Sequence, residues 1–212
     1  MEVVAGGAKG TNYDDAMSTR GPYAKSAAKR EEILRIALEH FTRDGYDRVS
    51  VREVAREAGM TQAGLLHHFA TKRDLFLEVI KWRHTKDADR FEPGTRAVDA
   101  IIDAAGWNAL EPGLVRLYVL LSAEGTIEPG AGHDFFTERY DRTLGALSDD
   151  IARRQAEGSV RSDYSASELA SLLVATADGL QLQWLLQPET VDMRARLRRF
   201  WEGLAAPADR AG

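Results

Sequence analysis

The chain has 212 residues, of which 44% are hydrophobic and 29% charged, and its formal net charge at pH 7 is −5. This length and composition are ordinary for a globular chain that buries a core in one or two domains. The absence of cysteine excludes a disulfide scaffold, a thiolate metal site and a cysteine nucleophile, and it fits a reducing compartment. No apolar run reaches about 18 residues, and residues 1–20 lack the apolar segment of a secretory signal. We therefore expect a cytoplasmic protein without a membrane partner.

The charge is unevenly distributed along the chain. Residues 20–90 contain 15 basic and 11 acidic side chains, whereas residues 91–212 contain 12 basic and 19 acidic ones. A basic N-terminal segment on an acidic chain is typical of a module that binds a polyanion, joined to a body with another task. Imbalances of this size also arise by chance, so the charge supports nucleic-acid binding only together with a motif.

The first helix is predicted from about residue 25 onward. Residues 1–20 are rich in Gly, Ala and small polar residues without apolar periodicity, and we expect them to be a disordered tail. Helical periodicity begins near Lys25, and Asp44-Gly45 is expected to end the helix. The residues of its inner stripe follow the spacing i, i+3, i+4, i+7 and i+8: Ile33, Ile36, Ala37, His40 and Phe41.

Two short helices with clear start signals come next. Ser50 is a good N-cap, and Glu53 three residues later completes a capping box. Gly59 ends this helix because glycine adopts left-handed backbone without strain. Thr61 then caps a very short helix that ends near Phe69.

The rest of the chain is also predicted to be helical. Apolar stripes at helical spacing indicate a helix behind Thr71, helices on both sides of Pro112-Gly113, a longer one at about 134–157, and two more at about 166–186 and 190–205. No window alternates with period two over the length of a strand. We predict an all-α fold of about nine helices.

The segment from Ser50 to Phe69 has the pattern of a helix-turn-helix. Leu65 and Phe69 are four residues apart and should attach the second helix to the core. Its outer face has no carboxylate to repel phosphate and consists of Gln62, Ala63, Gly64, His67 and His68. Helix–Gly–helix corners also occur in all-α proteins that never bind nucleic acid. The pattern alone therefore leaves open a protein-interaction module whose helix-turn-helix is structural.

Residues 29–80 resemble the DNA-binding domain of the TetR family of bacterial transcriptional regulators. The resemblance is carried by Lys29-Arg30-Glu31-Glu32-Ile33-Leu34, residues 37–41, Gly45-Tyr46, Ser50-Val51-Arg52-Glu53-Val54-Ala55, Gly59-Met60-Thr61, His68-Phe69, Thr71-Lys72 and Leu75-Phe76. The remaining residues resemble the family only in the number and lengths of their helices.

The resemblance implies a set of DNA contacts. The positions that it places at base edges are Arg52, Gln62, Ala63, Gly64 and His67. Those that it places at phosphates are Ser50, Thr61, His68 and Lys72, several of them at helix N-termini, where backbone amides favour an anion. Leu66 departs from the family pattern, in which many members have a phosphate-binding Tyr. We expect Leu66 to contact a thymine methyl or to pack.

The same resemblance implies a division of the chain into domains. It implies a helix-turn-helix DNA-binding domain at 21–71, a connecting helix at 72–92 and a helical ligand-binding and dimerisation domain at 93–205. The flanking segments 1–20 and 206–212 are expected to be disordered tails.

Two groups of side chains in the C-terminal part are candidates for a site. The predicted ligand pocket consists of Trp107, Tyr118, Phe136 and Trp184, with Phe135 nearby and Asp103, Glu124, His133 or Asp178 as polar partners. An aromatic residue on an apolar stripe is more often plain core than part of a pocket. The predicted dimer interface consists of Leu180, Trp184, Leu197 and Trp201 on the last two helices, which would form a four-helix contact about a two-fold axis.

We expect no enzyme activity, no cofactor and no metal site. The sequence contains no Gly-rich phosphate loop, nucleophile elbow or recognisable pair of catalytic carboxylates. His67 and His68 are adjacent in a helix and have no ligand-type residue at i+3 or i+4.

The predicted function is a homodimeric transcriptional repressor. It would bind a palindromic operator in double-stranded DNA and release it when a small-molecule effector binds. The alternatives are a DNA-binding regulator without an effector and a helical interaction module.

Overall fold

The computed structural model describes residues 22–88, 91, 94–127 and 129–205, and within them the fold is all-α. The described residues form nine helices and no strand, which confirms the predicted fold class. The bounds are α1 Pro22–Asp44, α2 Val51–Glu57, α3 Gln62–His68, α4 Lys72–Ala88, α5 Ala97–Asn108, α6 Pro112–Gly125, α7 Ala131–Ala156, α8 Ala166–Leu186 and α9 Met193–Ala205. The tails expected at 1–20 and 206–212 lie outside the described residues.

Two helix starts differ from the expected positions. Helix α7 begins at Ala131, because Gly130 has a φ of 145° and the helix starts directly after it. Helix α9 begins at Met193 rather than near residue 190. The carboxylate of Asp192 accepts a hydrogen bond from the N–H of Ala195 at 2.9 Å, which makes Asp192 the N-cap.

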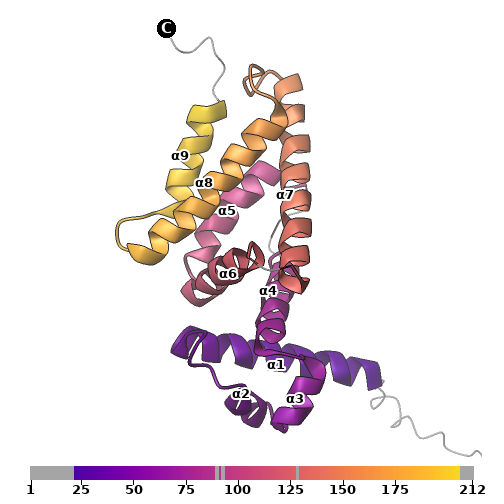
Figure 1. The fold of residues 1–212 in the computed structure, drawn as a ribbon. Coiled ribbons are helices and arrows are strands. Elements are labelled where there is room, and N and C mark those ends of the chain that lie inside the picture. The colour runs from indigo at the N-terminus through magenta and orange to yellow at the C-terminus, as the bar shows by residue number, and fades with distance from the viewer. Residues whose placement is uncertain (1–21, 89–90, 92–93, 128, 206–212) are drawn as a thin grey trace, which may run out of the picture.

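The helices form two groups joined by α4 (Figure 1). Helices α1, α2 and α3 form one end of the molecule, with α2 and α3 beneath α1. Helix α4 runs from this group to helices α5–α9. There, α7 packs along α8, and α9 packs against both α8 and α5.

The core consists of two clusters, and the first crosses the boundary between the two helix groups. It joins the inner residues of α1–α4 to Leu114, Leu117 and Leu121 of α6 and to Phe135 and Phe136 of α7. The second cluster holds α5, α7, α8 and α9 together, with Val115 of α6. Each fully buried aliphatic or aromatic side chain contributes about 1.5–3 kcal/mol relative to exposure. Helix α6 is therefore attached to both groups.

The four predicted dimer contacts lie inside the protomer, which corrects their assignment. Leu180, Trp184, Leu197 and Trp201 have exposed fractions of 7%, 8%, 0% and 7% and belong to the second core cluster. Periodicity identified two stripes that become buried. Within the protomer, α8 packs against α7 and α9, and α9 packs against α5 and α8. A side chain that is already buried within the protomer has almost no exposed surface left to bury against a partner subunit unless the protomer core repacks.

The outward face of α8 has an apolar stripe of its own. We define the outer α8 stripe as Leu172, Ala175, Gly179, Leu182 and Leu186, which follow each other at helical spacing. The exposed fractions of its leucines are 44%, 51% and 81%. Helix α8 is also the described helix whose length and composition would suffice to cross a membrane. Core helices of soluble proteins meet that criterion too, and Leu169 and Leu173 of α8 are fully buried in the second cluster.

Candidate nucleic-acid interface and a cavity between α6, α7 and α8

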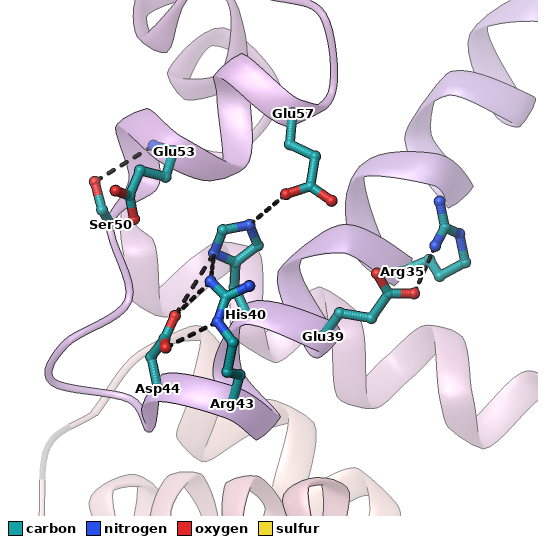
Figure 2. A network of polar contacts seen from close by, with 8 residues as sticks. All are labelled: Arg35, Glu39, His40, Arg43, Asp44, Ser50, Glu53 and Glu57. Atoms are coloured by element: carbon teal, nitrogen blue, oxygen red, sulfur yellow. Dashed lines mark hydrogen bonds and ion pairs between the residues drawn. The ribbon is translucent and has the colours of Figure 1, made fainter.

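Helices α2 and α3 are joined by a tight turn, and Ser50 and Thr61 cap them as predicted, although only the Ser50 half of the predicted capping box with Glu53 is present among the described contacts. The Ser50 hydroxyl oxygen accepts a hydrogen bond from the N–H of Glu53 at 3.3 Å (Figure 2). Gly59 has a φ of +66°, as expected for the residue that ends α2. The Thr61 hydroxyl oxygen accepts from the N–H of Gly64 at 3.0 Å and caps α3. Both hydroxyl groups use an oxygen lone pair here and keep their proton to donate.

Helix α3 is fixed by its inner side chains and exposes the rest. Leu65 is fully buried and Phe69 is 2% exposed. The guanidinium of Arg30 lies 4.6 Å above the Phe69 ring and holds the end of α3 against α1. The outer side chains are exposed: Gln62, Ala63, Leu66, His67 and His68.

Gly64 has a structural role within α3. A Cβ atom at this position would lie 3.3 Å from the Thr61 hydroxyl oxygen. The glycine therefore leaves room for the N-cap of its own helix.

The predicted cations flank α3 on neighbouring elements. Arg52 is exposed on α2, and in the described part of the chain it has no ion-pair partner. Lys72 begins α4, where its ammonium lies 3.3 Å from the Asp47 carbonyl oxygen and 4.9 Å from the centre of the Tyr46 ring. Burial lowers the pKa of Lys72. These contacts hold Lys72 at the junction of the α1–α2 loop and α4.

A polar network fastens α2 to α1 (Figure 2). His40 of α1 is 3% exposed, and its Nε2 lies 2.8 Å from a carboxylate oxygen of Glu57 in α2. Its Nδ1 lies 2.9 Å from a guanidinium nitrogen of Arg43, which also pairs with Asp44 at 2.7 Å. The bond from His40 lowers the pKa of Glu57. The sequence placed His40 on an apolar stripe and contained no signal for this link.

A cavity of about 620 Å³ lies between α6, α7 and α8. We call it the α6–α8 cavity. Tyr118 of α6, Phe136 and Tyr140 of α7, and Asp178 of α8 line it, as do His133 and Gln181. Two smaller cavities of about 80 and 60 Å³ share Tyr118 and Gln181 with it and extend toward α5 and α4.

The polar groups around the cavities are paired across helices. The hydroxyl of Tyr140 donates to Asp178 at 2.5 Å, and burial raises the pKa of both groups. Arg139 donates to Nδ1 of His84 at 2.9 Å. Burial lowers the pKa of His84 to about 4, so this imidazole is a neutral acceptor at pH 7.

The structure brings together only half of the predicted ligand pocket. Tyr118 and Phe136 line the α6–α8 cavity, with ring centres 5.5 Å apart. Trp107 instead packs against Phe91 at 5.0 Å, and Trp184 belongs to the second core cluster. These two tryptophans are outside the lining of the three cavities.

Of the four predicted polar partners of the pocket, two line the cavity and two form ion pairs elsewhere. Asp178 and His133 line the cavity. Asp103 pairs with Arg194 at 2.5 Å, and Glu124 with Arg73 at 3.5 Å. Within the described residues, no group of three or more His, Cys, Asp or Glu side chains is arranged to hold a metal ion.

Helix α6 connects the cavity to the DNA-binding helices. At its N-terminal end, Glu111 pairs with Arg83 of α4. A Cβ added to Gly113 would lie 2.1 Å from the Thr42 hydroxyl oxygen, so α6 touches α1 directly. At its other end, the Glu124–Arg73 pair returns to the start of α4. Helix α6 is therefore in contact with both α1 and α4.

Two family models match the sequence. The model described as "Bacterial regulatory proteins, tetR family" matches residues 33–79, which run from the second half of α1 through α2 and α3 into the first half of α4. The model described as "BetI-type transcriptional repressor, C-terminal" matches residues 128–206.

Individual proteins agree with these matches. The HTH-type transcriptional repressor Rv1474c of Mycobacterium tuberculosis is 26% identical over 163 residues, covering 73% of this chain and 81% of that protein. The HTH-type transcriptional regulator AcrR of Shigella flexneri is 23% identical over 186 residues, covering 81% and 85%. A structure described as a transcriptional regulator from Saccharomonospora viridis in complex with choline matches with a TM-score of 0.69 and 26% identity, covering 83% and 96% of the two chains.

Proposed function

The chain belongs to the TetR family of bacterial transcriptional regulators, and from this premise we propose that it is a homodimeric repressor released from its operator by a small-molecule effector. We assign residues 21–71 to DNA binding, 72–92 to the connection, and 93–205 to effector binding and dimerisation. The protein would act in the cytoplasm, where its DNA is.

The exposed outer face of α3 is the observation that carries DNA binding. It presents donors and acceptors but no carboxylate, on a helix fixed from behind by Leu65 and Phe69. Arg52, Gln62, Ala63, Gly64 and His67 are the residues we propose at base edges. Ser50, Thr61, His68 and Lys72 are those proposed at phosphates, with Leu66 as a further contact. The two sets correspond to two kinds of contact: contacts to base edges read the sequence, and contacts to phosphates position the protein on the duplex.

The outer α8 stripe supports the homodimer. One recognition helix contacts too few base pairs for specific affinity near 10⁻⁸ M. Two helices in successive major grooves need a separation of about 34–36 Å, which a dimer fixes. Gly179 lies in the middle of the stripe, and an added Cβ there would meet no atom within 4 Å, so a second helix could approach closely. We propose α8 and α9 as the dimerisation elements, with the contact made through the outer α8 stripe.

The α6–α8 cavity supports an effector. Phe136 both lines it and belongs to the first core cluster, which includes the inner residues of α1–α4. An effector that binds one arrangement of α6 and α7 better than another would shift the population of DNA-binding conformers. The choline in the similar Saccharomonospora viridis regulator also favours a small molecule over a regulator without an effector.

Selection from random duplexes followed by fluorescence anisotropy tests this function. The protein should enrich a palindromic sequence and bind it about 10³-fold or more tightly than random DNA. Arg52→Ala should lose most of that preference, whereas Arg153→Ala, at an exposed position of α7, should keep it. Equal affinity of the unmodified protein for every duplex would contradict a regulator and favour an interaction module.

A further inference from the structure

We propose that Arg48, in the loop between α1 and α2, is a further residue that binds a backbone phosphate of the DNA, next to the phosphate contact proposed for Lys72. The inference rests on the proposed function, because it adds a contact to the proposed DNA interface. It follows from three observations on the described residues. Lys72 is held against this loop, Arg48 is an exposed cation without a partner among them, and a neighbouring carboxylate offsets the charge of Lys72.

Lys72 is held against the loop that carries Arg48. Its ammonium donates a hydrogen bond to the carbonyl oxygen of Asp47 at 3.3 Å, and this carbonyl group belongs to the peptide bond that joins Asp47 to Arg48. The backbone nitrogen of Arg48 is therefore less than about 6 Å from the ammonium. The Tyr46 ring also contacts the ammonium, and it packs against Phe76 with ring centres 5.5 Å apart. The position of Lys72 beside Arg48 is thus set by the core of this end of the molecule.

Arg48 is a cation that the fold leaves available. Its side chain is exposed, and among the described contacts it makes neither a hydrogen bond nor an ion pair. The carboxylate of Asp44, four residues earlier, is already bound by Arg43 through both oxygens, at 2.9 and 2.7 Å. The bond from Arg43 is the main cause of the lowered pKa of Asp44, and Arg48 is the weakest of the charges that contribute to it. The N–H donors of the Arg48 guanidinium are therefore available to a ligand.

Arg48 also lies close to a second proposed phosphate contact, Ser50. The residue between them, Val49, is 4% exposed and belongs to the first core cluster. The backbone is extended at Ser50, where successive side chains point to opposite sides. Arg48 is thus an exposed neighbour of two proposed phosphate contacts, Ser50 along the chain and Lys72 across the loop.

The charges around Lys72 favour a second cation at this place. Burial lowers the pKa of Lys72, and the negative charge of the exposed Asp47 opposes this effect. A phosphate beside Lys72 would therefore be repelled by the Asp47 carboxylate as well as attracted by the ammonium. Arg48, the next residue in the chain, supplies a second positive charge. Its guanidinium can also bind two oxygens of one phosphate at once, which an ammonium cannot do.

The salt dependence of DNA binding tests the inference. Anisotropy is measured with the selected operator and with a random duplex, between about 50 and 200 mM salt. Arg48→Ala should weaken binding to both duplexes by a similar factor and lower the slope of log K against log salt by about one unit for each protomer that binds. Arg48→Lys keeps the charge, so it should keep the slope and lose less affinity.

Arg35→Ala is the matched control. It removes the same charge from an exposed position of α1, where Arg35 pairs with Glu39 at 2.5 Å (Figure 2). This variant should change neither the slope nor the affinity. Circular dichroism melts establish that each variant is folded.

A slope that is equal in the Arg48→Ala and Arg35→Ala variants would overturn the inference. So would a loss of affinity confined to the operator, because a phosphate contact carries no sequence information. The unmodified protein separates this result from the proposed function. If it prefers an operator, and Lys72→Ala lowers the slope but Arg48→Ala does not, the function stands and the inference fails. If it prefers no sequence, but Arg48→Ala lowers the slope on random DNA, the phosphate contact stands and the regulator function fails.

Discussion

The carboxylate of Asp150 in α7 accepts a hydrogen bond from the backbone N–H of Val98, at 3.0 Å, and thereby caps the first turn of α5. The side chain of Asp150 is fully buried, and its other oxygen lies 2.7 Å from Arg96 and 3.3 Å from Arg154. Two helices far apart in the sequence are thus joined through one charge, and that charge has hydrogen-bonding partners on both oxygens.

Replacing Asp150 should destabilise the C-terminal helices. Asp150→Asn keeps an acceptor for the N–H of Val98 but weakens the bonds from Arg96 and Arg154, which retain their other partners Glu157 and Asp99. We expect a loss of about 1–3 kcal/mol in the free energy of unfolding, measured by urea denaturation. Asp149→Asn, one residue away and exposed, should change it by less than about 0.5 kcal/mol. Equal effects of the two substitutions would mean that the contacts of Asp150 add nothing to the free energy of unfolding.

The same carboxylate predicts how stability depends on pH. Burial raises the pKa of Asp150, but the bonds from Val98, Arg96 and Arg154 outweigh it and hold the pKa below the ordinary value. The unfolded chain therefore takes up the proton first as the pH falls, so this contribution is complete above the unfolded pKa and declines below it. The difference in unfolding free energy between the unmodified chain and Asp150→Asn should be constant above about pH 5 and shrink below about pH 4. If this difference in unfolding free energy instead grew as the pH fell, the pKa of Asp150 would be higher in the folded chain than in the unfolded chain, which would contradict the prediction.

Lys72→Ala should weaken binding to all DNA sequences by a similar factor. A phosphate contact carries no sequence information, and its loss should reduce the slope of log K against log salt by about one unit. Lys86→Ala, near the other end of α4, is the control and should leave the slope unchanged. An unaltered slope for Lys72→Ala would remove this residue from the interface.

Gln62→Ala should act on specificity. A side chain that bonds a base edge contributes about 1–3 kcal/mol of discrimination, so the loss should appear on the operator and be small on random duplexes. Anisotropy on both duplexes at one salt concentration measures it. Equal losses on both would assign Gln62 to positioning.

Leu172→Glu should convert the proposed dimer into monomers. Leu172 is 44% exposed on the outer α8 stripe, so the charge does not disturb the protomer core but would be buried between two copies. Light scattering should find half the mass of the unmodified protein, with unchanged helical content. Leu110→Glu, at a leucine that is 79% exposed between α5 and α6, should remain dimeric. A dimeric Leu172→Glu protein would place the interface elsewhere.

The N-terminal elements could be predicted because their signals are local. Ser50 and Thr61 bond to amides three residues away, and Gly59 adopts its φ alone, so each signal is complete within a few residues. The expected start of α9 near residue 190 is wrong because Asp192 caps the helix, and the sequence also offers Thr190 as a cap-type residue two positions earlier.

The C-terminal sites depend on contacts that no local pattern contains. Tyr140 and Asp178 are 38 residues apart, and only the packing of α7 on α8 brings them together. The stripe containing Trp184 and Leu197 correctly indicated burial, but periodicity cannot distinguish a neighbouring helix from a partner subunit as the surface that buries it.

The spacing of half-sites tests the central claim most directly. Two α3 helices fixed by one dimer should bind a palindrome as two protomers per duplex. Inserting about 5 base pairs, half a helical turn, between the half-sites should move one of them to the opposite side of the DNA. We expect the operator affinity to fall to the level of random DNA, measured by anisotropy with the stoichiometry from light scattering. An operator affinity that is unchanged by the insertion would contradict the account.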